Sequence, residues 1–335
     1  MLTVDGTSVR QLYKSRKVIA SLFASISILV IGSLLLYIQS LNHKMSSLEE
    51  RFHTISAQMA SYERAYCTNA LSMTQVNTTT EHSLTSAGYQ RSYQVHTPKH
   101  YDPSVRYPVV VSFDGIGGSG DHIEAYSGFN TLPVIAVYPD ALPGKQGFTA
   151  WQGAPYSLDG DYDIEFIRDL LDALPSQYCI DATKLFAVGM SNGGGFAAIV
   201  GCRMSDQFRA VAGVSGAYYT SCNAQKRTAS LLVVHGAEDK QVPLKGSRAR
   251  KLPEVAEWVK EEALDRSCRR EVAGVSYATA TSYDWRDCRD DSILRLVVLQ
   301  NQKHGWLTIP HGIEDDASNT TEYIWRFFEE SMYAL

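Results

Sequence analysis

The stretch that decides the fold is Leu185-Phe186-Ala187-Val188-Gly189-Met190-Ser191-Asn192-Gly193-Gly194-Gly195-Phe196. Its apolar beginning is typical of a buried parallel strand, and the apolar residues from Phe196 onward predict a helix that follows at once. Between them lies Gly-x-Ser-x-Gly, which on a strand-turn-helix forms a nucleophile elbow with Ser191 exposed. The turn needs Gly189 and Gly193 because a Cβ at either position would clash. A glycine-rich strand-to-helix turn without chemistry is the alternative interpretation.

Apolar segments on both sides of this stretch alternate between strand and helix patterns. This alternation predicts an α/β fold, a mainly parallel sheet with helices on both faces. Loops at the C-terminal ends of the strands are then the expected place for chemistry. The predicted strands are 91–97 (at an edge), 107–113, 132–138, 210–215, 231–235 and 293–299, and the predicted helices are 162–174, 253–265 and one through 323–328.

A serine nucleophile needs a base, usually a histidine held by a carboxylate, and in this architecture the order is Ser, Asp or Glu, His. The strand 231–235 leads to Glu238 and Asp239, and we prefer Asp239 because it lies a few residues past the strand end. The strand 293–299 leads to His304, and His311 is the fallback. The predicted catalytic residues are therefore Ser191, Asp239 and His304.

A tetrahedral intermediate needs two hydrogen-bond donors aimed at its oxygen. The backbone N–H of Asn192 is one candidate, and the loop 114–120 after the strand 107–113 supplies the other, by position the N–H of Ile116. A glycine-rich loop of this kind can also bind phosphate, but no Lys-Ser/Thr follows and no Gly-x-Gly-x-x-Gly opens a helix. A nucleotide site is therefore not expected.

The composition limits which classes of partner and cofactor are expected. The 335 residues carry a net charge of −5 with both signs mixed, which argues against nucleic acid as the main partner. The histidines are scattered, and neither Cys-x-x-Cys nor His-Glu-x-x-His occurs, so we expect no metal site and no cofactor.

The N-terminal region predicts a membrane anchor. The 21 residues Val18–Ile38 carry no charge, which is enough for a helix that crosses a bilayer. Basic residues gather before it (Arg10, Lys14, Arg16 and Lys17), so residues 1–17 are expected in the cytosol and the rest outside or in a lumen, as in a type II membrane protein. A cleaved signal peptide, giving a secreted protein, is the alternative.

Two segments are expected between the anchor and the catalytic domain. Within 39–66, apolar residues from Leu41 to Tyr62 repeat at heptad spacing, which predicts a helical stalk that could join copies as a coiled coil; a single amphipathic helix is the alternative. Residues 67–88, rich in Thr, Ser and Asn, predict a linker, and 89–335 the catalytic domain. Asn77 and Asn319 begin glycosylation sequons.

An external or lumenal domain permits disulfides among the six cysteines. Cys179 precedes the elbow strand and Cys202 lies about three turns into the following helix, so Cys179–Cys202 is the first predicted pair. Cys268 and Cys288 bracket an apparently irregular stretch and form the second, and Cys67–Cys222 follows by exclusion. Buried free thiols are the alternative.

Several short motifs together resemble the polyhydroxybutyrate-depolymerase-like esterases, and more closely their secreted feruloyl esterase branch. The resemblance covers about Tyr89 to Tyr333 and implies an α/β-hydrolase fold with Ser191, Asp239 and His304 as its triad. Its motifs are Arg91-Ser92-Tyr93 with Pro98, Tyr107-Pro108-Val109-Val110, Val137-Tyr138-Pro139, Asp163 before Phe166-Ile167, Tyr178-Cys179-Ile180-Asp181, Gly189 to Phe196, Val214 to Tyr219, His235-Gly236 with Asp239 and Val242-Pro243, and His304-x-Trp306.

Two departures from that family pattern stand out. Asp114 occupies a position where the family usually has histidine, and a carboxylate near a developing oxyanion is unfavourable if it points inward. Leu307 stands where proline tends to follow His-x-Trp. Trp306 and Trp151 are candidate walls of a substrate pocket, although core packing explains either of them equally well.

The resemblance implies a serine carboxylic-ester hydrolase that acts on feruloyl, acetyl or hydroxyalkanoate esters. Two alternatives stay open at this point. One is a serine peptidase on the same fold, and the other is a non-catalytic binding protein presented on the stalk.

Overall fold

The computed structural model describes residues 76–222, 229–277, 279–289, 291–309 and 319–333, together with residues 32, 34–35, 37–42 and 44–46, which are helical. The chain divides into two units, Met1–Ala65 and Tyr66–Leu335. Most of the predicted anchor (18–38) and stalk (39–66) lies outside the described residues, so both stay predictions. Within the described part of the chain, no helix combines the length and apolar character needed to cross a membrane.

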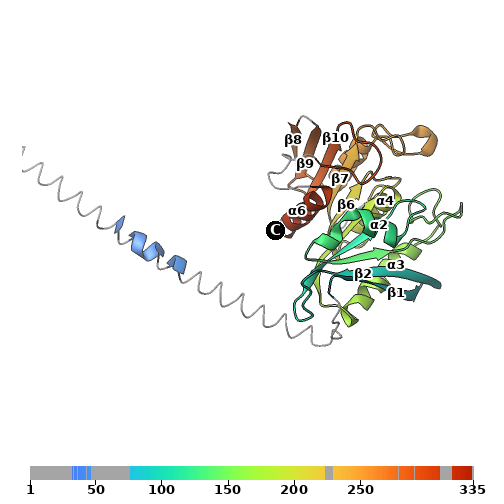
Figure 1. The fold of residues 1–335 in the computed structure, drawn as a ribbon. Coiled ribbons are helices and arrows are strands. Elements are labelled where there is room, and N and C mark those ends of the chain that lie inside the picture. Colours follow the sequence, from blue (N-terminus) through green and yellow to red (C-terminus); the bar gives the residue numbers. More distant parts are fainter. Residues whose placement is uncertain are drawn as a thin grey trace, which may run out of the picture. The chain divides into compact units, whose positions relative to one another are not determined.

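The second unit is built on one ten-stranded sheet in the order β1-β2-β4-β3-β5-β6-β7-β10-β9-β8 (Figure 1). From β4 to β10 all neighbours are parallel, whereas the strands at both ends pair antiparallel. The strands are β1 (Thr78–Ser86), β2 (Tyr89–Thr97), β3 (Tyr107–Phe113), β4 (Ile135–Pro139), β5 (Ile180–Met190), β6 (Phe208–Val214), β7 (Ser230–Gly236), β8 (Arg270–Tyr277), β9 (Ala280–Arg286) and β10 (Leu294–Leu299).

Helices cover both faces of the sheet (Figure 1). Successive residues of one strand point to opposite faces, so Leu185 and Ala187 of β5 join one apolar core while Phe186 and Val188 join the other. The first core also takes in side chains of α3 (Tyr162–Ala173), α4 (Asn192–Arg203) and α5 (Val255–Asp265), and the second those of α2 (Gly120–Ser127) and α6 (Thr320–Tyr333). The predicted α/β architecture, a mostly parallel sheet between helices, is confirmed.

Two predictions are wrong at the edge of the sheet that β1 and β2 form. Residues 78–86 of the predicted linker 67–88 form β1, and this strand covers 91–97, which is therefore not an edge strand. Ala87 and Gly88 join β1 to β2, both at positive φ (49° and 82°), as a tight two-residue hairpin requires. The sequence conceals β1 because its half-buried face is lined by Thr, His and Leu rather than by a clear apolar alternation.

At the opposite edge of the sheet, formed by β9 and β8, a third prediction is wrong. The stretch between Cys268 and Cys288, predicted as irregular, is the antiparallel hairpin β8–β9, which extends the sheet beyond β10. Charged residues of β9 explain why the pattern was missed. Asp284 of β9 forms an ion pair with Arg295 of β10 at 2.7 Å. The charged side chain therefore has its partner on the neighbouring strand, although in the sequence it looks like a loop residue.

The second core gives a direct test of the fold. Phe186 is fully buried on β5 and stacks on Phe328 of α6, with ring centroids 4.7 Å apart. We expect Phe186→Ala to lower the free energy of unfolding by about 3–5 kcal/mol, because it leaves a large cavity. Phe148→Ala is the matched control, since Phe148 is 61% exposed. Equal stability of the two variants in chemical denaturation would contradict the packing described.

Candidate active site

Ser191 lies between the last residue of β5 and the first residue of α4, with φ 57° and ψ −118°. A side chain in this region of φ is strained, and the turn is tolerated because glycines stand two residues before and two residues after Ser191. A Cβ on Gly189 would lie 2.1 Å from the carbonyl oxygen of Gly193, and one on Gly193 would lie 2.1 Å from that of Phe113. The predicted requirement for glycine at these two positions is confirmed.

Hydrogen bonds to the neighbouring strand hold the strained residue in place. The N–H of Ser191 donates to the carbonyl of Val214, at the end of β6, at 2.9 Å. The N–H of Ala217, in the segment after β6, donates to the carbonyl of Ser191, also at 2.9 Å. Both polar backbone groups of Ser191 are therefore used, and the hydroxyl is the part of the residue left for chemistry.

The loops after β7 and β10 bring Asp239 and His304 together. The two strands are adjacent and parallel, so these loops emerge at the same edge of the sheet. They touch, because Glu238 N–H donates to the carbonyl of Gln302 at 2.9 Å. As a result His304 Nδ1 lies 2.7 Å from Asp239 Oδ2. Glu238 is exposed, and His311 lies outside the described residues.

The Asp239 carboxylate is completely buried and well supplied with donors. Its Oδ1 accepts hydrogen bonds from the backbone N–H groups of Gln241 and Val242, each at 2.8 Å. Burial alone would raise the pKa of Asp239, but the bond from His304, the Val242 N–H and the two nearby histidines outweigh it and lower the pKa below its usual value. Asp239 is therefore ionised beside His304.

Two further side chains fix the loops that carry this pair. His235, fully buried at the end of β7, hydrogen-bonds through Nε2 to the carbonyl of Val242 at 2.8 Å, which closes the turn around Asp239. Burial lowers the pKa of His235, so it is neutral and donates this bond. Ser215, just past β6, donates from Oγ to the carbonyl of Gly305 at 3.0 Å. The backbone directly after His304 is thus tied to β6.

Ser191 lies on the same edge of the sheet, since β5, β6, β7 and β10 are successive parallel neighbours. Within the described residues, Ser191 Oγ makes no hydrogen bond to His304. The structure therefore contains a direct contact between Asp239 and His304, with Ser191 on a turn at the same end of the parallel strands.

The predicted oxyanion donors lie beside Ser191. A Cβ on Gly115 would be 3.2 Å from the Cβ of Ser191, so the loop after β3 passes directly over the elbow. This loop is held by a hydrogen bond from Gly117 N–H to the carbonyl of Thr149 at 2.8 Å. Among the described residues, neither Ile116 N–H nor Asn192 N–H has an acceptor. Two unpaired donors next to a serine are suited to bind an oxyanion.

Asp114, which stands where the family usually has histidine, is hydrogen-bonded on both carboxylate oxygens. Its buried carboxylate accepts hydrogen bonds from Tyr126 Oη at 2.6 Å and from its neighbour Gly115 N–H at 2.7 Å, and its other oxygen lies 2.6 Å from His122 Nδ1. Burial and this carboxylate raise the pKa of Tyr126, so its hydroxyl remains a donor. The carboxylate of Asp114 is thus hydrogen-bonded to side chains of α2. These bonds hold the loop that carries Ile116 against α2.

The two predicted pocket tryptophans have different positions. Trp151 is buried, stacks on Phe196 of α4 at 4.9 Å and donates from Nε1 to the carbonyl of Asp114 at 3.1 Å. It packs behind the elbow, so the prediction that it lines the pocket is wrong. Trp306 is partly buried and lines a cavity of about 290 Å³ that does not include Ser191. A substrate contact by Trp306 stays a prediction.

Ser191 opens into a pocket of about 630 Å³, and most of the residues that line it were not among the predicted site residues. Its lining includes Ile116, Tyr156 and Tyr219, together with residues 240–242 and 249–252, which follow Asp239 in the chain. The available signal was the basic run Arg248-Ala249-Arg250-Lys251, which shares a loop with the predicted acid. Among the described residues, no group of His, Cys, Asp or Glu could hold a metal ion.

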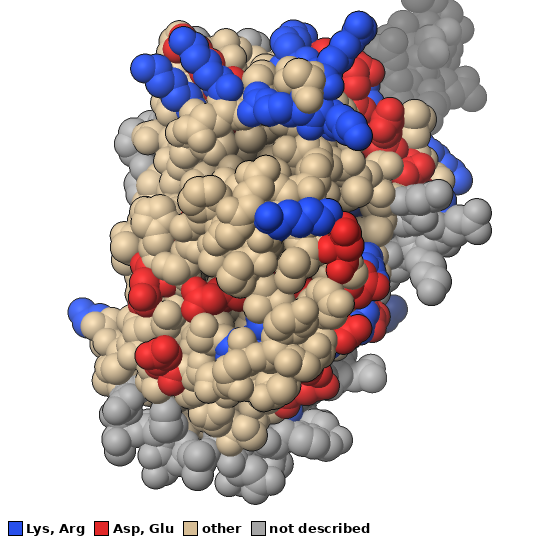
Figure 2. All heavy atoms as spheres, turned by 90° about the vertical axis from the view of Figure 1, so that its right-hand side faces the viewer, with Lys and Arg blue, Asp and Glu red and all other residues tan. Residues whose placement is uncertain are grey.

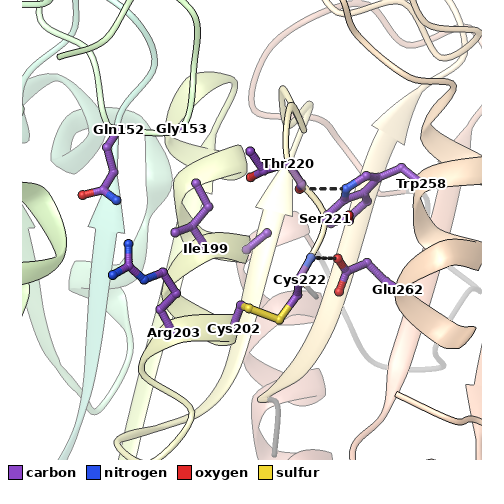
Figure 3. A pocket seen from close by; sticks show the side chains of 11 residues that line it. Gln152, Gly153, Ile199, Cys202, Arg203, Thr220, Ser221, Cys222, Trp258 and Glu262 are labelled. Carbon is purple, nitrogen blue, oxygen red and sulfur yellow. Dashed lines mark hydrogen bonds between the residues drawn. A yellow bond between two sulfur atoms is a disulfide. The ribbon is translucent and has the colours of Figure 1, made fainter. Parts of the chain in front are cut away.

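The disulfides partly differ from the prediction. Cys202 is bonded to Cys222, with Cα atoms 5.6 Å apart, so the predicted pairs Cys179–Cys202 and Cys67–Cys222 are wrong. The reason is the segment after β6, which runs back along α4 and reaches Cys202, while the Cys222 N–H donates to the buried Glu262 of α5 at 2.7 Å (Figure 3). The predicted Cys268–Cys288 bond is present.

The structure describes the remaining predicted cysteine and the two predicted glycosylation sites as follows. Cys179 is disulfide-bonded as well, to a partner outside the described residues. Asn77 and Asn319 are both exposed, and Asn319 Oδ1 also accepts the N–H of Glu322 at 3.0 Å at the start of α6. Glycosylation at the two asparagines stays a prediction.

Comparison with known proteins agrees with this site. The model of the Esterase family matches residues 84–331. Probable feruloyl esterase C of Aspergillus terreus is 28% identical over 165 residues, and feruloyl esterase C of Emericella nidulans is 27% identical over 165 residues. Each match covers 47% of this chain and 57% of the relative, so the chain spans little more than half of these proteins. The resemblance predicted from the motifs is confirmed.

A solved structure supports the fold. Acetyl xylan esterase from Aspergillus awamori superposes with a TM-score of 0.53 at 15% identity, covering 75% of this chain and 99% of that one. At this identity the likeness concerns the fold alone.

The pKa of Asp239 leads to a prediction about stability. Because its folded-state pKa lies below the usual 3.8, ionised Asp239 stabilises the fold above that pH and this contribution is lost as the pH falls through the lowered value. We expect Asp239→Asn to cost about 1–3 kcal/mol of unfolding free energy near neutral pH, with a smaller cost below pH 3.8. Urea unfolding at several pH values measures it.

Glu238→Gln is the matched control for this comparison, because Glu238 is the adjacent carboxylate and is exposed. We expect it to change the unfolding free energy by less than about 0.5 kcal/mol near neutral pH. A cost for Asp239→Asn that stays constant with pH would show that the charge of Asp239 is not what the fold uses.

Proposed function

Because the chain belongs to the Esterase family, we propose that it is a serine carboxylic-ester hydrolase of the feruloyl esterase type. The observation that carries the proposal is the buried Asp239–His304 pair, 2.7 Å apart, on loops at the sheet edge where the strained Ser191 lies. A histidine oriented by an ionised carboxylate is the base that a serine nucleophile requires. The names of the relatives support a hydroxycinnamoyl ester as substrate.

In the first half of the proposed reaction, Ser191 Oγ attacks the ester carbonyl while His304 Nε2 takes the hydroxyl proton. Asp239 keeps the Nδ1 proton of His304 in place and stabilises the imidazolium that forms. The N–H groups of Ile116 and Asn192 bind the oxyanion. When the tetrahedral intermediate collapses, the C–O bond of the ester breaks, and His304 gives its proton to the departing alcohol.

In the second half, a water molecule replaces the alcohol and attacks the acyl-enzyme. His304 again takes a proton, now from the water, and the same two N–H groups bind the second oxyanion. Collapse of this intermediate returns the proton to Ser191 Oγ and releases the carboxylic acid. Each step uses only groups that this chain supplies together with water.

The proposal extends to where the protein acts. We propose a type II membrane protein anchored by 18–38, with the catalytic domain outside the cell or in a lumen and copies joined through 41–62. The disulfides Cys202–Cys222 and Cys268–Cys288 support an oxidising compartment. Secretion after signal cleavage is the alternative, and protease protection of the full chain in intact vesicles distinguishes an anchored protein from a released one.

The first prediction from the proposed function concerns the nucleophile. A fluorophosphonate probe should label the full chain at Ser191, and Ser191→Ala should lose labelling and lower kcat/KM for methyl ferulate by at least about 10⁴-fold. His304→Ala should lose labelling as well, because the hydroxyl would have no base. Labelled peptides are identified by mass spectrometry.

Ser104→Ala is the matched control, since Ser104 is exposed and its hydroxyl donates to the Asp102 carboxylate, away from the site. Absence of any adduct on the folded full chain would refute the esterase proposal and favour a binding protein. Faster cleavage of a feruloyl amide than of the corresponding ester would favour a peptidase instead.

The second prediction concerns the oxyanion donor at Ile116. Ile116→Pro removes the N–H, whereas Ile116→Ala keeps the N–H and removes more of the side chain than proline does. We expect the proline variant to lower kcat by about 10²–10³-fold and the alanine variant by much less. Equal effects on kcat would show that the side chain, not the N–H, matters at this position.

A further inference from the structure

The pocket that opens at Ser191 is lined by positive charge. Lys240, Arg250 and Lys251 all line it, and among the described residues no Asp or Glu does. The whole chain has a net charge of −5, so this concentration of cations is a local property of one segment. On the face shown in Figure 2, Lys and Arg side chains gather at the upper edge, the side on which 240–252 lies in Figure 1.

The segment presents these cations on a defined backbone. Ser247 and Leu252 exchange two hydrogen bonds, at 2.9 and 3.0 Å, and close the loop that contains Arg250 and Lys251. Leu252 is buried against Val242 and Ala217, so the base of the loop is anchored in a small apolar cluster. The positive groups are therefore held at the rim of the pocket rather than carried on a free end.

Most of this charge is not neutralised by the protein. Among the described residues, Lys240, Arg250 and Lys251 have no carboxylate partner. Arg250 donates to the carbonyl of Gln241, next to Lys240, which orients its guanidinium without cancelling its charge. On the same loop Lys245, which does not line the pocket, is paired with Glu254 at 2.6 Å. In the part of the chain that the structure describes, the three cations that line the pocket beside Ser191 are therefore left without an acid, as is Arg248, which does not line it.

The same pocket also suits a flat group next to an anion. Tyr156 and Tyr219 meet edge to face, with ring centroids 6.1 Å apart, and both line the pocket. Arg250 lines the same pocket, and its positive charge acts on both phenols. A planar or ring-shaped substrate part against these tyrosines would bring an attached anion toward the guanidinium.

We propose that the ester cleaved at Ser191 carries an anionic group, a carboxylate, sulfate or phosphate, which binds to Lys240, Arg250 and Lys251. The inference rests on the proposed esterase function and specifies its substrate class. Cations at an open pocket rim attract and orient such a group, and the attraction weakens as salt rises. Neutral esters lack this interaction and are poorer substrates.

The test compares matched pairs of esters on the full chain. The acyl-side pair is the 4-nitrophenyl monoester of glutaric acid and 4-nitrophenyl valerate, and the alcohol-side pair is 4-acetoxybenzoate and 4-acetoxybenzamide. For at least one pair, we expect the ratio of kcat/KM (anionic over neutral) to fall about tenfold in the double variant Arg250→Gln, Lys251→Gln. In the wild type, 0.5 M salt should lower the same ratio.

A second double variant controls for net charge. Lys184→Gln with Arg168→Gln also removes two positive charges, from residues outside the pocket, Lys184 being paired with Asp181 and Arg168 with the carbonyl of Arg203. We expect this variant to keep the wild-type ratio for both pairs. A fall in the ratio here as large as in the pocket variant would overturn the inference, because the general field of the protein would then be responsible.

Other outcomes are equally decisive. Unchanged ratios for both pairs in the pocket variant would overturn the inference, and loss of heparin binding alone in that variant would assign the cations to a polyanion instead. If Ser191 is not labelled by the fluorophosphonate and neither member of any pair is hydrolysed, the esterase function itself has failed. Labelling with unchanged ratios leaves the esterase function standing and rejects only the anionic substrate.

Discussion

The strained backbone of Ser191 is the constraint on which the rest of the structure depends. A positive φ at a serine persists only where surrounding contacts enforce it. Here β5 must end at Met190, α4 must begin at Asn192, and the carbonyl of Phe113 must lie where any side chain at residue 193 would be. Strand, helix and the neighbouring loop after β3 are thus adjusted to one another around a single residue.

The second requirement is that β7 and β10 be parallel neighbours. Their chain positions are far apart, and β8 and β9 come between them in the sequence, yet the sheet places them side by side. Asp239 and His304 therefore leave the sheet at one edge, and a backbone hydrogen bond between their loops sets their separation. The outer hairpin β8–β9 lies beyond β10 and so does not separate the pair.

The parts predicted correctly from sequence are those with strong local signals. Strands such as β5 and β7 are buried on both faces and show as continuous apolar runs, and the elbow glycines follow from sterics. Strand β1 and the hairpin β8–β9 were missed because polar residues satisfied by partners across the sheet look like loop residues. Trp151 and the partner of Cys202 depended on long-range packing that no spacing reveals.

The loop 239–252 combines two tasks that many proteins assign to separate segments. Its first residue, Asp239, is the buried carboxylate that contacts His304, whereas Arg248 to Lys251 are exposed and contribute nothing to either core. Substitutions at the distal end can therefore accumulate without cost to the sheet, while the proximal end is fixed by its hydrogen bonds. Divergence among related chains should accordingly be concentrated at the tip of this loop, where one change alters what is recognised and not how it is cleaved.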